Sequence, residues 1–159
     1  MSQIIEQRLA TLLGNFGLLP FYGLMLLHWL PLKPLAQRLT ELAFVGYAAV
    51  VLSFLGAVHW GLALANPQLD KSQSRLALGW GVLPALLGWL ALLLLLIGVP
   101  TWIVCALLLI DFALCRSMDG ALMRLYANPP RWYLPLRTRL TVMVMIAVAI
   151  LLLSSLRGG

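Results

Sequence analysis

Four long stretches of this sequence contain no charged residue, and they constrain the fold more than any other feature. They cover residues 9–32, 42–69, 76–110 and 140–156, which is 24, 28, 35 and 17 residues. A helix needs about 20 mostly apolar residues to cross the roughly 30 Å of hydrocarbon in a bilayer. Because 62% of the residues are hydrophobic and only 10% are charged, a soluble domain is excluded. The sequence therefore predicts a protein embedded in a membrane.

The stretch 76–110 is too long for one span, and the sequence Gly-Val-Pro-Thr at 98–101 divides it. Glycine and proline interrupt helices, so a third span is expected to end near Ile97. A fourth span is expected to begin near Thr101. The short connection permits only an antiparallel hairpin of the third and fourth spans.

We therefore predict an all-α fold, a polytopic integral membrane protein with a five-helix transmembrane bundle that forms a single domain, 1–159. The expected spans are approximately 9–30, 42–65, 76–97, 101–122 and 140–156. The fourth span is the least apolar, because it carries three ionisable residues. If it did not insert, a four-span protein would result.

Lysine and arginine are distributed unequally between the two sides of such a bundle. The side that holds the N-terminus and the second and fourth loops carries eight of them, and the other side carries three. Because cytoplasmic loops are enriched in Lys and Arg, the N-terminus is expected in the cytoplasm and the C-terminus outside. The net charge of +6 is then a topology signal and implies lipid contact, with no nucleic-acid partner.

The first apolar segment lacks the layout of a cleavable signal and is interpreted as a retained anchor. No arginine-rich transit peptide precedes it, which favours a bacterial inner (cytoplasmic) membrane. The segment 126–139 combines aromatic residues, arginines and prolines, a composition typical of the headgroup region. It is interpreted as an aromatic belt, with a docking segment for a partner as the alternative.

Small residues at a spacing of four indicate how the spans pack, because helices in lipid associate where their backbones approach closely. Three such rows are Ala49, Ser53, Ala57 and Gly61; Ala77, Gly81 and Ala85, followed by Gly88; and Ala113, Ser117 and Ala121. His59 lies on the face of its helix opposite the first row. Both faces require a protein neighbour, so the second span is expected at the centre of the bundle.

Ionisable groups within the spans are the first candidates for chemistry, since each costs about 2.5–3.5 kcal/mol at the bilayer centre. Asp111 lies deepest in the fourth span. Arg116 and Asp119 are three residues apart and are expected to pair. Asp111 needs a proton, water or a donor from another span. The candidate buried polar cluster is His59, Trp60, Trp80, Asp111, Arg116 and Asp119, which either holds the helices in register or forms a ligand or proton site.

No recognised motif for a cofactor, a metal ion or a catalytic group accompanies this cluster, so none is expected. His28 and His59 are expected at opposite membrane faces, about 20 Å apart, which is too far to bracket one haem iron. Cys105 and Cys115 are about 15 Å apart on one helix and cannot form a disulfide.

Four fragments of the chain together resemble the membrane family known as domain of unknown function 3429. They are GAVHWG at 56–61, WGVLPA at 80–85, PRWYLPLRTRLT at 130–141 and LLPF at 18–21. The resemblance implies an integral protein of a bacterial or mitochondrial inner membrane. It marks His59, Trp60 and Gly61 as the signature of the second span, and it transfers no catalytic residue.

The sequence leaves three functions open. The first is a non-enzymatic accessory, assembly or subunit protein of a larger membrane complex, favoured by the small size and short loops. The second is a proton or small-solute carrier that uses His59 and Asp111 and requires oligomers to form a path. The third is a membrane enzyme that acts on a lipid or quinone at the buried polar cluster.

Overall fold

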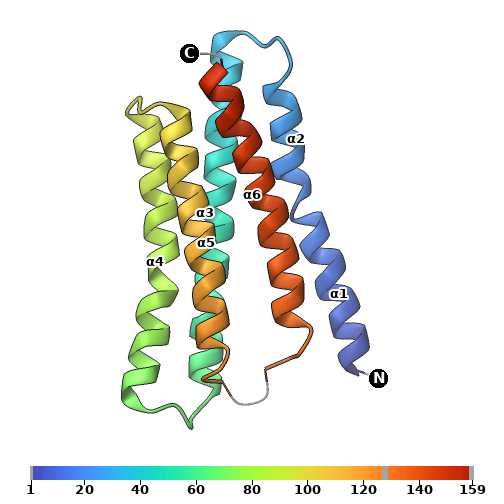
Figure 1. Ribbon diagram of the computed structural model, residues 1–159, viewed down its shortest axis with the longest axis vertical. Helices are drawn as coiled ribbons and strands as arrows, with labels where there is room; N and C mark the ends of the chain where they lie inside the picture. Colours follow the sequence, from blue (N-terminus) through green and yellow to red (C-terminus); the bar gives the residue numbers. More distant parts are fainter. Residues whose placement is uncertain (1, 127–128, 158–159) are drawn as a thin grey trace.

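The computed structural model describes residues 2–126 and 129–157, and within these ranges all regular structure is helical (Figure 1). The helices are α1 (Ser2–Phe16), α2 (Leu19–His28), α3 (Pro34–Ala65), α4 (Lys71–Leu96), α5 (Thr101–Leu122) and α6 (Tyr133–Arg157). Five segments are long and apolar enough to cross a membrane, namely α1 with α2, and each of α3 to α6. The predicted five-helix membrane bundle is confirmed.

Several helices continue beyond the expected spans at their charged ends. Helix α3 begins at Pro34 and α6 at Tyr133, each about two turns before the first charge-free residue. Helix α4 begins after Asp70, whose carboxylate accepts a hydrogen bond from the Gln73 amide at 2.8 Å, while the Gln73 side chain accepts one from the Asp70 amide at 3.1 Å. A charge ends the apolar part of a helix but leaves its backbone hydrogen bonds intact.

The first span is broken between α1 and α2. Pro20, in the first turn of α2, has no amide hydrogen and interrupts the helical hydrogen bonds at this point. At the break, the Tyr47 hydroxyl of α3 donates to the Gly17 carbonyl at 2.9 Å. The two helices still follow one another toward the same end of the bundle, as Figure 1 shows.

The turn at 98–101 reverses the chain as predicted. Gly98 has a φ of +93°, in the left-handed region that glycine adopts without strain. The Val99 amide donates to the Leu94 carbonyl at 3.0 Å, and the Gly98 amide to the Leu95 carbonyl at 3.1 Å. These two bonds form a Schellman motif that ends α4. Helix α5 then runs antiparallel to α4, and the two ends of the chain lie at opposite ends of the bundle (Figure 1).

The main apolar core is formed by buried residues of α2, α3, α4, α5 and α6. Its centre is a set of edge-to-face aromatic contacts, in which Phe21 meets Phe44 at 5.4 Å and Phe112 at 6.4 Å between ring centroids. All three rings are inaccessible or nearly so. Aromatic pairs of this geometry are each worth about 0.5–1.5 kcal/mol beyond their buried area. They join α2, α3 and α5.

Helices α3 and α4 are in backbone contact at glycine. A Cβ built on Gly56 would overlap the Gly81 carbonyl oxygen, and one on Gly81 would lie 2.8 Å from the Gly56 oxygen. About two helical turns from this contact, a Cβ built on Gly88 would lie 2.9 Å from the Ala49 Cα. The predicted packing of the row through Gly81 and Gly88 is therefore confirmed.

The other two small-residue rows do not pack inside the bundle, and the prediction was wrong for them. In the first row only Ala49 meets a neighbouring helix, whereas Ser53, Ala57 and Gly61 are exposed. The third row, Ala113, Ser117 and Ala121, is exposed throughout. Helix α3 is consequently covered on its His59 side and open on the side of the row. We call these six exposed residues the outward rows.

Gly56→Ala tests the contact between α3 and α4. The added methyl group has no space against the α4 backbone, so the helices must separate, and overpacking of this kind costs about 1–3 kcal/mol. We expect a lower melting temperature for the purified protein in detergent. Gly61→Ala is the matched control, because a Cβ there meets no atom within 4 Å. Equal melting temperatures for both variants would contradict the backbone contact.

Candidate functional site

Three buried ionisable side chains meet where α3, α5 and α6 converge. Asp119 of α5 accepts from the Nε2 of His59 of α3 at 2.9 Å through one carboxylate oxygen. Its other oxygen lies 2.7 Å from the Nε of Arg137 of α6. The exposed fractions of His59, Asp119 and Arg137 are only 1%, 1% and 7%. We call these three residues the Asp119 cluster.

Two neutral groups form further hydrogen bonds with the Asp119 cluster. The Tyr126 hydroxyl lies 3.3 Å from the Nδ1 of His59, and the two rings are stacked. The Nη1 of Arg137 donates to the Thr141 hydroxyl, one turn further along α6, at 2.8 Å. Burial, followed by the charge of Asp119, raises the pKa of Tyr126. The hydroxyl therefore keeps its proton at neutral pH.

The proton positions in the Asp119 cluster follow from these partners. A carboxylate only accepts, so the His59 Nε2 that faces it carries a hydrogen. A neutral imidazole then has a free lone pair on Nδ1, which accepts from the Tyr126 hydroxyl. Asp119 and Arg137 balance each other in charge. This arrangement joins three helices through one carboxylate.

The candidate cluster expected from the sequence is divided in the structure. His59 and Asp119 do meet, but Asp111 lies two turns away from Asp119 on α5 and contacts neither. The Sγ of Cys115 donates to the Asp111 Oδ1 at 3.8 Å, and the Asp111 Oδ2 has no hydrogen-bond partner within the described residues.

Arg116 does not pair with Asp119, contrary to prediction. Its Nε donates to the Thr138 hydroxyl of α6 at 2.7 Å. Both side chains reach α6, where Arg116 bonds to Thr138 and Asp119 pairs with the adjacent residue, Arg137, so the spacing of three residues on α5 does not produce an ion pair. The ion pair that forms is between helices rather than within one.

The two tryptophans lie in the apolar part of the bundle. The indole of Trp60 donates to the Leu78 carbonyl of α4 at 2.8 Å. Trp80 is half-buried and packs against the main apolar core and against a second group of buried residues, Ala63, Ala77, Leu122, Met123 and Tyr126. Neither side chain is a member of the Asp119 cluster.

Sequence reasoning missed Arg137, which belongs to the Asp119 cluster, and the two residues that bond to the cluster, Tyr126 and Thr141. Arg137 and Tyr126 belong to the segment assigned to the headgroup region, yet both are buried. The available signal was the need of Asp119 for a cation. The spacing of four between Arg137 and Thr141 puts a hydroxyl within reach of the guanidinium on one helix face.

The described residues offer no set of three His, Cys, Asp or Glu side chains that could hold a metal ion. His28 contacts Gln37 on α3, which is 22 residues before His59, or about 33 Å along the helix. The two histidines therefore belong to separate sites at opposite ends of the bundle. Both cysteines are free and buried, as expected for small core residues.

A bundle of five membrane-crossing segments, held by an internal ion pair, defines an integral membrane protein. The chain matches, over residues 6–153, the model of a family described as protein of unknown function (DUF3429), and it belongs to that family. It is also 33% identical over 153 residues to transmembrane protein 69 of Xenopus tropicalis, across 92% of this chain and 54% of that protein. The chain thus spans about half the length of this curated relative. No solved structure matches it.

Arg137→Gln tests the Asp119 cluster. It leaves the Asp119 carboxylate buried without its cation, and removal of one partner from a buried pair costs about 3–5 kcal/mol. We expect this loss in the free energy of unfolding measured in detergent. The control is Arg116→Gln, which removes a half-buried arginine bonded to Thr138 and is expected to cost about 1 kcal/mol.

The double variant Asp119→Asn/Arg137→Gln checks the cause of the loss. Because it removes both charges, it should be more stable than the sum of the two single variants predicts. Additive effects would contradict an ion pair between these residues.

Proposed function

We propose that this protein is a non-enzymatic subunit or assembly factor of a larger membrane complex. The observation that carries the proposal is the position of the outward rows on α3 and α5. Rows of small residues let helix backbones approach closely in lipid, and leucine-like side chains do not. Among the residues that the structure describes, no helix covers these rows. A transmembrane helix of a partner subunit is the occupant that their chemistry fits.

The polar groups of the outward rows support this interpretation. The Ser53 hydroxyl donates to the Ala49 carbonyl at 2.8 Å, and the Ser117 hydroxyl to the Ala113 carbonyl at 2.9 Å. Both hydroxyls thus bond to their own helix. The surfaces that remain are shallow and apolar, which suits van der Waals contact with another helix more than recognition of a soluble ligand.

The proposed address is a bacterial-type inner membrane, with the N-terminus in the cytoplasm and the C-terminus outside. The support is the charge distribution, because eight of the eleven Lys and Arg residues belong to the N-terminal side of the bundle. Loops rich in Lys and Arg are retained in the cytoplasm during insertion. The Asp119 cluster would then lie at the cytoplasmic end.

Cysteine labelling tests the proposed orientation. A membrane-impermeant maleimide should label Ser72→Cys only in inside-out vesicles and Lys33→Cys only in right-side-out vesicles, because both positions are exposed at opposite ends of the bundle. The native cysteines are buried and give a low background. Labelling of both variants from the same side would contradict five spans, and the reverse pattern would contradict the orientation.

A proton or small-solute carrier is the second candidate, and Asp111 favours it. This carboxyl is 1% exposed, and its Oδ2 has no hydrogen-bond partner within the described residues. Asp111, Cys115 and Asp119 follow each other at a spacing of four, so they share one buried face of α5. Such a line of titratable groups inside a membrane is typical of proton pathways.

Purification from native membranes in mild detergent distinguishes the two candidates. We expect a stoichiometric partner subunit, and its loss in Ala57→Leu and Ser117→Leu without a change in melting temperature. Gly79→Leu is the matched control, because Gly79 is an exposed small residue of α4 outside the outward rows. A homo-oligomer that loses proton transport in Asp111→Asn would instead support the carrier.

A further inference from the structure

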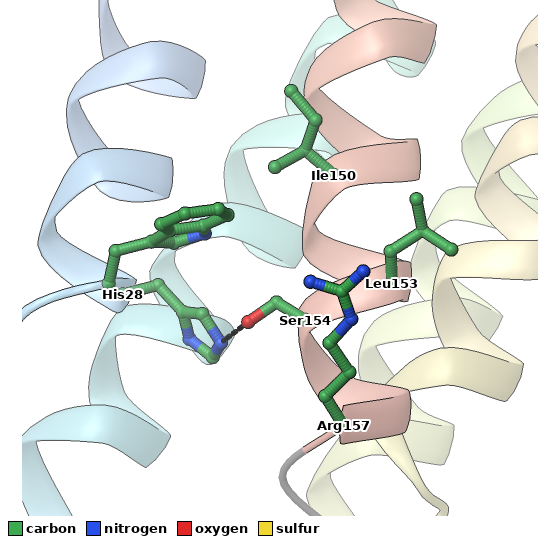
Figure 2. Close-up of a pocket in the computed structure, with 6 residues that line it drawn as sticks. His28, Ile150, Leu153, Ser154 and Arg157 are labelled. Carbon is green, nitrogen blue, oxygen red and sulfur yellow. Dashed lines mark hydrogen bonds between the residues drawn. The ribbon is translucent and has the colours of Figure 1, made fainter.

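A pocket of about 480 Å³ lies between α2 and α6, at the end of the bundle opposite the Asp119 cluster. It is lined by His28, Trp29, Ile150, Leu153, Ser154 and Arg157 (Figure 2). Its polar side chains come from the last turns of α2 and α6, where each helix approaches the membrane surface. The pocket therefore meets lipid at the depth of the headgroups.

The hydrogen bonds of His28 determine which proton faces the pocket. The Nε2 amide group of Gln37 donates to the His28 carbonyl at 3.1 Å and lies 2.9 Å from the His28 Nδ1, the shorter of its two ring contacts. An amide nitrogen only donates, so Nδ1 accepts and the hydrogen of the neutral ring is on Nε2. That hydrogen is donated to the Ser154 Oγ at 3.1 Å. The Ser154 hydroxyl hydrogen is then left to donate into the pocket.

Arg157 adds a positive charge beside this hydroxyl, as Figure 2 shows. It is exposed and has no ion-pair partner within the described residues. Glu41, the acidic residue at this end of the bundle, is bonded to Arg38 at 3.2 Å and to the Thr101 hydroxyl at 2.8 Å. The hydrogen-bonding groups that remain free in the pocket, the Ser154 hydroxyl and the Arg157 guanidinium, are therefore donors. They favour a ligand that carries hydrogen-bond acceptors.

The rest of the pocket is apolar. Ile150 and Leu153 precede Arg157 on α6 by seven and four residues, so they extend about 10 Å and 6 Å from it toward the bilayer centre. Trp29 is 65% exposed at the rim, where tryptophan favours the boundary between headgroups and acyl chains. One end of the pocket suits an oxyanion and the other suits a hydrocarbon chain.

We propose that this pocket binds one anionic phospholipid. Its phosphate accepts from the Arg157 guanidinium and the Ser154 hydroxyl, and an acyl chain lies along Leu153 and Ile150. Guanidinium and phosphate form charge-assisted hydrogen bonds, which are the strong ones. Because Arg157 supplies a positive charge without an ion-pair partner within the described residues, an anionic lipid binds more tightly than a zwitterionic lipid with the same chains.

Native mass spectrometry of the full chain in detergent tests the site, with phosphatidylglycerol and phosphatidylcholine of equal chain length as probes. We expect one tightly bound phosphatidylglycerol, and binding about tenfold weaker in Arg157→Gln. Ser154→Ala removes a donor but keeps the charge, so it should weaken binding of both lipids and retain the preference for phosphatidylglycerol. Lys33→Gln is the matched control, because it removes an exposed cation from the same end of the bundle outside the pocket.

Three results would overturn the proposal. If the Arg157→Gln variant binds phosphatidylglycerol as tightly as the unmodified chain does, the pocket is excluded as the lipid-binding site. An equal loss in Lys33→Gln would show general attraction to the charged face rather than a site. Displacement of the lipid by millimolar inorganic phosphate would show a site for a free anion. Melting temperatures of the variants are measured in parallel, so that a folding defect is recognised as such.

Discussion

A charge inside hydrocarbon must find its partner within the protein, and the architecture of this bundle depends on that constraint. Asp119 obtains two partners from two other helices, His59 of α3 and Arg137 of α6. At the opposite end, Glu41 of α3 is bonded to the Thr101 hydroxyl of α5 and to Arg38 of its own helix. Between the two ends the core is apolar apart from Asp111, whose Oδ2 has no hydrogen-bond partner within the described residues. The bundle is thus joined by polar contacts at both ends and by packing in the middle.

Buried ion pairs contribute less to stability than to the choice of one arrangement. Desolvation of both charges offsets most of their attraction, so well-packed apolar side chains of equal volume would hold the helices at least as firmly. Any shift of α5 along α6 would, however, separate Asp119 from Arg137 and leave both charges unpaired. The Asp119 cluster therefore fixes the register of three helices whose other contacts are mostly apolar and interchangeable.

The number of spans, the reversal at Gly98 and the buried position of His59 and Asp119 could be predicted from the sequence. These features depend on local properties, namely charge-free length, glycine and proline, and the cost of a charge in lipid. Arg137 could not be predicted, because its aromatic and proline-rich surroundings indicated the headgroup region. Helix α6 in fact begins at Tyr133, so Arg137 lies one turn inside it. Which helix supplies a partner is a property of the whole fold.

Residue size alone also failed to identify the inward faces. Gly56 and Gly61 are close together on the same helix, yet only Gly56 meets the α4 backbone. In a soluble protein the outward face of a helix is polar, so the sequence pattern identifies it. In lipid both faces are apolar, so a row of small residues fits either an internal contact or one made with another chain.

The break at Gly17 has a consequence for how the bundle is assembled. Helix α1 packs chiefly on α6, where the Asn15 side chain accepts from Arg139 at 2.7 Å, and its apolar residues are largely exposed. Helix α6 follows α1 to α5 in the sequence, so during translation α1 enters the bilayer well before this neighbour exists. The hinge separates it from α2, which meets α3 much earlier. Insertion can thus proceed while α1 rests in lipid, and the bundle closes only when α6 arrives.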